Sequence, residues 1–290
     1  MKSYVKVIAS MLIWGTLPVF VSKIPQSSAE IVMWRILFGV AFLSIIHTLS
    51  KSKSPLGDWK GPAPKLMLSG FFMGTNWVAL FEAYRFVGPS VATLIYYLAP
   101  IMVMIASFII FKENLGPVKI IGTISALIGM FIVTGMGSGG SAPTKGILFA
   151  FVAAACYASV TLINKGVKGL NGVERTILQL MGAGLVVIPY AIATHQGAWL
   201  NLVSEAGIFA VLIGILHSGL ALYLYFSSIQ ELPAQSVALC SYIDPASALF
   251  FSAMLLGDAL GPVQLVGAVM MLGGAAAGEI FGNKTSKKDC

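Results

Sequence analysis

Residues 96–117 read YYLAPIMVMIASFIIFKENLGP, and residues 241–262 read SYIDPASALFFSAMLLGDALGP. The two stretches correspond at an offset of 145 residues and continue in register beyond their ends. Matching positions include Tyr97 and Tyr242, Pro100 and Pro245, Gly122 and Gly267, and Gly129 and Gly274. Because 145 is half of the 290-residue length, the sequence is predicted to be one unit that has been duplicated.

The composition is that of a protein embedded in a bilayer. Hydrophobic residues make up 57% of the chain and charged residues only 10%, against roughly 25% charged residues in a soluble domain. The net charge of +7 is spread between apolar runs and forms no patch. We therefore expect a polytopic membrane protein whose surroundings are lipid, with no nucleic-acid partner.

Apolar runs long enough to cross a membrane recur down the whole chain. A hydrocarbon core of about 30 Å needs roughly 20 apolar residues per helix. Ten runs fit this length, at residues 5–22, 31–49, 66–86, 90–111, 117–136, 145–164, 174–194, 206–228, 234–256 and 262–281. Five spans per half is an odd number, so the second copy enters the membrane from the opposite side. The predicted fold is all-α and integral to the membrane, with ten transmembrane helices in two five-helix inverted repeats.

The distribution of Lys and Arg predicts the orientation. With the N-terminus inside, only Lys23, Arg35, Arg85 and Lys145 of the 18 basic residues fall on the outer side, and 18 − 4 = 14 fall on the inner side. Both termini are therefore expected in the cytoplasm. The predicted division is a first repeat at 1–136, a linker at 137–144, and a second repeat at 145–290 that ends in a short basic cytoplasmic tail.

Asp244 is the first candidate for a functional residue. It falls in the middle of the ninth run, directly before Pro245, and a central Asp costs about 2.5 to 3.5 kcal/mol on insertion scales. Pro245 and its counterpart Pro100 are expected to open their helices, and matched breaks in two repeats point to a transport site. The alternative is an Asp that only satisfies backbone groups freed by the proline.

His217 and two further charged residues also fall within the predicted spans. His217 lies at the depth of Asp244, which suggests a proton relay or a charge-paired substrate handle, or else a simple buried histidine. Arg35 and Glu82 each fall about one turn from the outer end of a span, so they are predicted to form an ion pair. Such a pair would latch an outer gate or only hold two helices together.

Polar and aromatic residues gather in the same runs. Asn76 is a polar candidate at membrane depth in the third run. An aromatic box with one or two acids would suit an aromatic side chain or an organic cation, although aromatic stripes also serve plain packing. The aromatic candidates within the spans are Trp14, Trp77, Tyr97, Tyr157 and Tyr242.

Several segments together resemble a known family. They are residues 76–85 (NWVALFEAYR), 92–100 (ATLIYYLAP), 111–113 (FKE), 217–226 (HSGLALYLYF), 232–234 (LPA) and 241–245 (SYIDP). In these segments the sequence resembles the drug/metabolite transporter (DMT) superfamily, and specifically its bacterial EamA-type members, over nearly the whole chain. The resemblance implies a ten-helix carrier in the inner membrane with a central cavity between the repeats.

The resemblance also implies which positions line that cavity. They are Trp14, Asn76, Trp77, Tyr97, Tyr157, His217 and Tyr242. Members of the family export amino acids and other metabolites, while relatives in the superfamily import choline or carry nucleotide sugars. The second repeat departs from the first, because Ala221 stands at the position of Asn76 and Ser227 at that of Glu82. The two repeats are therefore expected to line the cavity with chemically different side chains.

These observations favour a secondary transporter that works by alternating access. The expected substrate is a small molecule, most simply an amino acid or its derivative that is exported, with coupling to protons as one mode. An alternative is transport of choline-like quaternary amines or other organic cations through an aromatic cage around Glu82 or Asp244. A channel or a membrane enzyme is more remote, since no HExxH, paired acidic metal motif or Gly-x-Ser-x-Gly is present. No catalytic residue, metal or cofactor is expected, and small-residue helix contacts allow a monomer or a homodimer.

Overall fold

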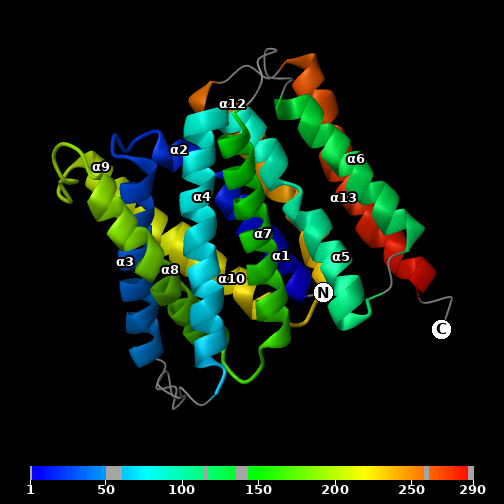
Figure 1. The fold of residues 1–290 in the computed structure, drawn as a ribbon, viewed down its shortest axis with the longest axis horizontal. Helices are drawn as coiled ribbons and strands as arrows, with labels where there is room; N and C mark the ends of the chain where they lie inside the picture. Colours follow the sequence, from blue (N-terminus) through cyan, green and yellow to red (C-terminus); the bar gives the residue numbers. More distant parts are fainter. Residues whose placement is uncertain (1, 50–60, 114–115, 135–142, 258–260, 287–290) are drawn as a thin grey trace.

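The computed structural model describes residues 2–49, 61–113, 116–134, 143–257 and 261–286, and within these ranges the chain forms helices and no strand. The first half contains α1 (Lys2–Gly15), α2 (Leu17–Val21), α3 (Ser28–Leu49), α4 (Ala63–Tyr96), α5 (Ala99–Phe111) and α6 (Pro117–Thr134). The second half contains α7 (Thr144–Gly166), α8 (Gly172–Thr194), α9 (Glu205–Ile213), the π-helix η1 (Gly214–Leu220), α10 (Ala221–Ser228), α11 (Ala234–Cys240), α12 (Ile243–Leu256) and α13 (Pro262–Ser286). Figure 1 shows these helices in one bundle, with α1 beginning and α13 ending toward its lower side.

Many helices are long and apolar enough to cross a membrane. In the described ranges six segments have at least 18 helical residues and a mean hydropathy high enough for a membrane span. They are Lys2–Val21, Ser28–Leu49, Thr144–Gly166, Gly172–Thr194, Glu205–Ser228 and Ala234–Leu256. Three shorter apolar helices accompany them, at Ala99–Phe111, Pro117–Ile132 and Leu265–Phe281. The chain is therefore a multi-pass membrane protein. Of the predicted linker at 137–144 only the last two residues lie in the described ranges, and the end of the predicted tail, 287–290, lies outside them.

At two places a turn separates consecutive helices just before a proline. Between α4 and α5 the chain turns at Tyr97 and Leu98, and between α11 and α12 it turns at Ser241 and Tyr242. A proline ring clashes with the carbonyl four residues earlier, which is residue 96 for Pro100 and residue 241 for Pro245. The interruptions therefore fall where each proline forces the helix to open. The helix α4 also bends at Gly88, which has a φ of 75°. Glycine adopts such a positive φ without strain because it has no Cβ atom.

Residues that correspond in the two halves touch each other. The rings of Tyr97 and Tyr242 are stacked with centroids 6.1 Å apart, and the Tyr242 hydroxyl donates to the Tyr97 carbonyl at 3.5 Å. The Ser125 hydroxyl likewise donates to the carbonyl of Met270, 145 residues further along the chain, at 3.3 Å. These contacts bring together the turns that precede the two prolines, and they place α6 against its own counterpart α13.

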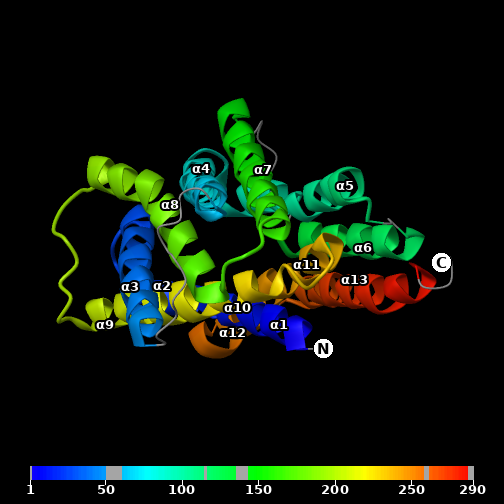
Figure 2. The ribbon, with the colours of Figure 1, turned by 90° about the horizontal axis from the view of Figure 1, so that it is seen from below.

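Helices α6 and α13 lie along each other in both Figure 1 and Figure 2. A Cβ atom at Gly122 would come within 2.5 Å of the Gly274 carbonyl oxygen, and one at Gly129 within 2.5 Å of the Gly267 carbonyl oxygen. The earlier glycine of α6 thus meets the later glycine of α13, so the two helices run antiparallel. Their backbones approach so closely that these positions have no room for a side chain.

A buried polar network ties α4, α7 and α8 together. Asn164 and Gln179 exchange side-chain amide hydrogen bonds of 2.7 and 3.0 Å, and the Ser69 hydroxyl donates to the Gln179 side-chain oxygen Oε1 at 2.9 Å. Arg175, which is 1% exposed, donates to the carbonyl of Val167 at 2.8 Å and so satisfies the C-terminal end of α7. Because the side chains of Ser69, Asn164 and Gln179 satisfy one another, we interpret the network as structural support for the bundle.

Candidate functional site

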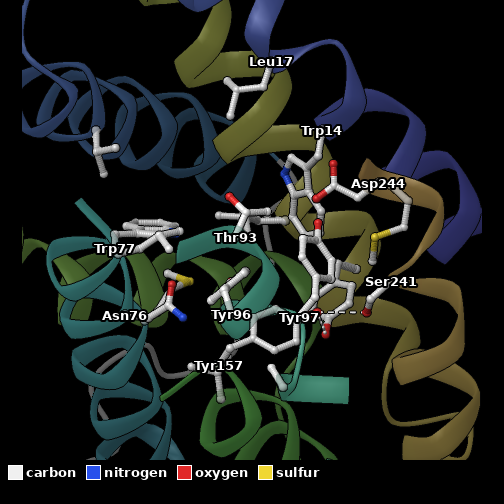
Figure 3. Close-up of a pocket in the computed structure, with 18 of the residues that line it drawn as sticks. Trp14, Leu17, Asn76, Trp77, Thr93, Tyr96, Tyr97, Tyr157, Ser241 and Asp244 are labelled. Carbon is white, nitrogen blue, oxygen red and sulfur yellow. Dashed lines mark hydrogen bonds between the residues drawn. The ribbon is translucent and has the colours of Figure 1, made fainter. Parts of the chain in front are cut away.

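A cavity of about 380 Å³ lies within the bundle, a size typical of small-molecule sites. Its walls come from α1, α2, α3, α4, α5, α7, α10 and α12, and most of the side chains on it are apolar or aromatic. Figure 3 shows Asn76 and Trp77 of α4 on one side of the cavity and Asp244 of α12 on the other. The polar side chains on its walls, apart from tyrosine and tryptophan, are Arg35, Asn76, Thr93, Ser241 and Asp244.

The two interrupted helix pairs supply much of this wall. The turn after α4 lets the neighbours Tyr96 and Tyr97 both face the cavity, and their rings meet edge to face at 5.6 Å. Tyr96 also contacts Tyr157 of α7 at 5.8 Å. On the other pair, Ser241 in the turn and Asp244 in the first turn of α12 reach the cavity. The matched prolines therefore shape the cavity from both halves of the chain.

Asp244 presents a bare carboxylate to the cavity. Within the described ranges its side chain takes part in no hydrogen bond and no ion pair, and the residue is only partly buried. Its place in the first turn of α12 puts a negative charge at the positive end of the helix dipole. The carboxylate does not satisfy backbone groups freed by Pro245, so this alternative account of Asp244 loses its basis.

Arg35 reaches the same cavity from α3. Its Nε donates to the Ser218 hydroxyl at 3.1 Å, and the guanidinium carbon lies 5.4 Å from the centre of the Trp77 ring. The residue is 7% exposed, and no carboxylate in the described part of the chain lies within 4 Å of its nitrogens. The stacked ring and the hydroxyl hold the guanidinium in place.

The predicted ion pair between Arg35 and Glu82 is wrong. Glu82 accepts a hydrogen bond from Arg85 at 2.8 Å and another from the Tyr190 hydroxyl, and it does not line the cavity. Arg85 stands three residues further along α4, on the same face of the helix. Equal depth in the membrane gave no information about the direction of each side chain, and Arg35 and Glu82 point to different neighbours.

A double-mutant cycle on Arg35→Gln and Glu82→Gln tests this correction. We expect the coupling in the free energy of unfolding to lie within about 0.5 kcal/mol of zero, because the side chains share no contact. A cycle on Tyr190→Phe and Glu82→Gln removes an actual hydrogen bond and serves as the positive control. A coupling between Arg35 and Glu82 as large as that of the control would restore the ion pair.

His217 lies outside the cavity and apart from Asp244. Its Nε2 is 3.0 Å from the Thr16 hydroxyl, its ring packs against Phe20, and its carbonyl accepts a hydrogen bond from the Trp14 indole at 3.0 Å. His217 sits in the π-helix η1, whose wider turns change the direction of side chains relative to an α-helix. The expected direct relay from His217 to Asp244 is therefore not formed, and His217 instead supports Trp14, which does line the cavity.

The remaining candidates divide between cavity and core. Asn76, Trp77 and Tyr157 line the cavity, whereas Tyr242 is fully buried against α6 and α13. The amide of Asn76 already donates to the Ala153 carbonyl at 2.6 Å, and the Tyr157 hydroxyl is 3.0 Å from that of Ser241. Cavity residues that the sequence did not single out include Tyr84, Thr93, Tyr96 and Ser241. Tyr96 and Ser241 carried a usable signal, since each adjoins a repeated tyrosine at a helix break.

Comparisons with known proteins agree on a family. The sequence pattern of the EamA-like transporter family matches residues 1–135 and 144–277. The "Uncharacterized transporter YxxF" of Bacillus subtilis is 28% identical over 94% of this chain and 88% of its own length. The "Riboflavin transporter ImpX" of Fusobacterium nucleatum is 27% identical over 63% of this chain and 64% of its own. A crystal structure of a protein 18% identical superposes with a TM-score of 0.83 over 98% of both chains, which shows a shared fold.

Proposed function

Because the chain belongs to the EamA-like transporter family, and is a transporter and not an enzyme, we propose that it moves an amino acid or its derivative outward by alternating access. The observation that carries this proposal is the cavity at the two matched helix breaks. Discontinuous helices that meet between repeats are where secondary transporters place their substrate. In this chain those breaks bring Tyr96, Tyr97 and Asp244 to one small cavity.

The proposed architecture has ten spans in two inverted repeats, residues 1–136 and 145–290, joined by the linker at 137–144. Three observations support it. Residues 145 apart are in contact at Tyr97 and Tyr242. Helices α6 and α13 pack antiparallel through the two glycines that the repeat gives to each of them. The family pattern matches each half separately. The excess of Lys and Arg on one side supports cytoplasmic termini in the inner membrane.

Reconstitution tests the proposed function directly. Purified protein in liposomes is offered labelled forms of the standard amino acids, choline and riboflavin, each with and without a proton gradient. We expect saturable uptake of at least one amino acid, and protein-free liposomes give the background. Uptake of choline alone would favour the quaternary-amine carrier, and a flux that never saturates would favour a channel. Protein that moves none of these solutes would end the proposal.

The structure gives less support to the quaternary-amine alternative. Glu82 lies outside the cavity and is already bound to Arg85 and Tyr190. Asp244 does face the cavity, but the cavity also contains Arg35, which would repel a second cation. A flat heteroaromatic metabolite is the stronger second candidate. The tyrosine-lined wall favours it, and one relative is named as a riboflavin transporter.

We propose that protons are coupled to transport through Asp244 without His217. Asp244 is the acidic side chain on the cavity wall and has no partner in the described ranges. A carboxylate that alternately binds a proton and a charged substrate would link the two movements. His217 makes its contacts with Thr16 and Trp14 instead.

A contact between the two halves suggests how one end of the carrier closes. Glu113, after the end of α5, accepts hydrogen bonds from the backbone N–H of Ala234 at 2.9 Å and of Gln235 at 3.3 Å, at the start of α11. The Gln235 amide donates back to the Glu113 carbonyl at 3.1 Å. In the proposed topology this end faces the cytoplasm, so the contact closes the cytoplasmic side and has to break when the carrier opens inward.

Glu113→Gln is expected to loosen this closure. The variant loses the charge that strengthens both backbone hydrogen bonds, so hydrogen exchange of the Ala234 and Gln235 amides should become about tenfold faster. The capped start of α8 at Asn171 and Glu174 is an internal control and should exchange at the same rate in both proteins. Unchanged exchange at Ala234 and Gln235 would remove Glu113 from the closing mechanism.

A further inference from the structure

The cavity contains two side chains of opposite charge, and the charged end of each faces it without a direct hydrogen-bond or ion-pair partner in the described ranges. In the described ranges no hydrogen bond reaches the terminal guanidinium nitrogens of Arg35 or the carboxylate oxygens of Asp244. None of these atoms is among the fully buried polar atoms that lack a partner. They are therefore open to the cavity and free to bind what enters it.

Arg35 and Asp244 attract each other electrostatically but share no direct contact. No nitrogen of Arg35 comes within 4 Å of an oxygen of Asp244 in the described part of the chain. Arg35 lies over Trp77, and Trp77 and Asp244 are on opposite sides of the cavity in Figure 3. A charge without a direct partner is unfavourable inside a membrane protein. A ligand that pairs with both charges is therefore strongly preferred over a ligand that pairs with only one of them.

The two groups differ in what they recognise. A guanidinium presents a planar set of donors that matches a carboxylate with two parallel hydrogen bonds. Nε of Arg35 is taken by Ser218, which fixes the plane and leaves the terminal nitrogens for the ligand. A carboxylate such as Asp244 accepts from an ammonium group. A molecule with only a positive charge would leave Arg35 unpaired, and one with only a negative charge would leave Asp244 unpaired.

The wall between the two charges is aromatic. Tyr84, Tyr96, Tyr97 and Tyr157 line it, with Trp77 beneath the guanidinium. Ring faces and edges of this kind bury an apolar or aromatic group. The cavity volume of about 380 Å³ leaves room for such a group in addition to the charged ends.

From these contacts we propose that the cavity selects zwitterions, with Arg35 binding the carboxylate, Asp244 binding the ammonium, and the tyrosine wall taking an apolar or aromatic side chain. This inference rests on the proposed function and makes it specific. It also changes the role of Arg35, which becomes a specificity-determining residue of the cavity and not a partner of Glu82.

Binding of matched probes to the purified wild-type protein tests the selection. Phenylalanine carries both charges, phenylalaninamide and phenethylamine only the positive one, and N-acetylphenylalanine only the negative one. We expect each of the three single-charge probes to bind at least about 30-fold more weakly than phenylalanine, by thermal shift or calorimetry. The comparison needs no variant, so a loss of folding cannot imitate the result.

The variant Arg35→Gln then tests whether Arg35 binds the carboxylate of the ligand. In this variant phenylalanine should lose its advantage over phenylalaninamide and bind within about threefold of it. Arg85→Gln, which changes a cation outside the cavity, should keep the wild-type preference. The ratio of two ligands on one protein does not depend on the folded fraction.

The outcomes separate this inference from the function on which it rests. If single-charge probes bind as tightly as phenylalanine while liposomes still take up amino acids, zwitterion selection is overturned and the carrier stands. If Arg35→Gln keeps the full preference for phenylalanine, Arg35 is not the carboxylate site. If amino acids neither bind nor move, both proposals fall together.

Discussion

Asp244→Asn is expected to reduce amino-acid transport by about 10- to 100-fold. A hydrogen bond to a charged group contributes about 1.5 to 3 kcal/mol, and each 1.4 kcal/mol is a factor of ten. The amide keeps the size of the carboxylate but not its charge, so it no longer balances a substrate ammonium. The change is read as the initial rate of phenylalanine uptake into liposomes.

Stability measurements separate this loss from misfolding. The Asp244 carboxylate accepts no hydrogen bond in the described part of the chain, so neutralising it leaves no donor unsatisfied. We expect the melting temperature of Asp244→Asn to be equal to or above that of the wild type. Glu205→Gln, an exposed acid in the first turn of α9, is the matched control and should change neither transport nor melting. Full transport by Asp244→Asn would remove Asp244 from the binding site.

Gly274→Ala is expected to destabilise the protein, although alanine is the better helix former. A Cβ atom at Gly274 would lie 2.6 Å from the Gly122 carbonyl oxygen and 2.9 Å from the Ala126 nitrogen. Both are backbone atoms and cannot rotate away, so α6 and α13 must separate. Overpacking of this kind costs about 1 to 3 kcal/mol, which exceeds the roughly 1 kcal/mol gained in helix propensity.

The neighbouring residue provides a matched control for this prediction. Gly273 stands on the same helix, but a Cβ atom there meets nothing within 4 Å. Gly273→Ala should therefore keep the gain in helix propensity and unfold at the wild-type temperature or slightly above it. Equal melting of the two variants would show that the contact between α6 and α13 does not support the fold.

The sequence predicted much of the fold because its signals were local. Apolar runs of sufficient length gave the helices, and a proline opens the helix at the carbonyl four residues before it, as at residues 96 and 241. Asp244 was found for the same reason, since a single charge in an apolar run is visible without a structure. Its position before Pro245 then placed it at the cavity.

The directions of side chains were not predictable in the same way. Arg35 and Glu82 share a depth, but a depth does not say which way a helix turns each residue, and the two found different partners. The predicted position of His217 was wrong for a related reason. No signal in the sequence around His217 predicts the π-helix, which turns the side chain toward Thr16. Tyr242 shares the repeat signal of Tyr97, yet only Tyr97 faces the cavity.

The most direct test of the central claim, that the cavity carries a zwitterionic amino acid across the membrane, is a counterflow measurement. Liposomes that contain the purified protein are loaded with unlabelled phenylalanine and diluted, without any ion gradient, into a trace of labelled phenylalanine. The account predicts that the label rises transiently above its outside concentration in the wild type, and that Asp244→Asn largely abolishes this rise. A folded wild type that shows no transient accumulation, or an Asp244→Asn variant that accumulates label as the wild type does, would contradict it.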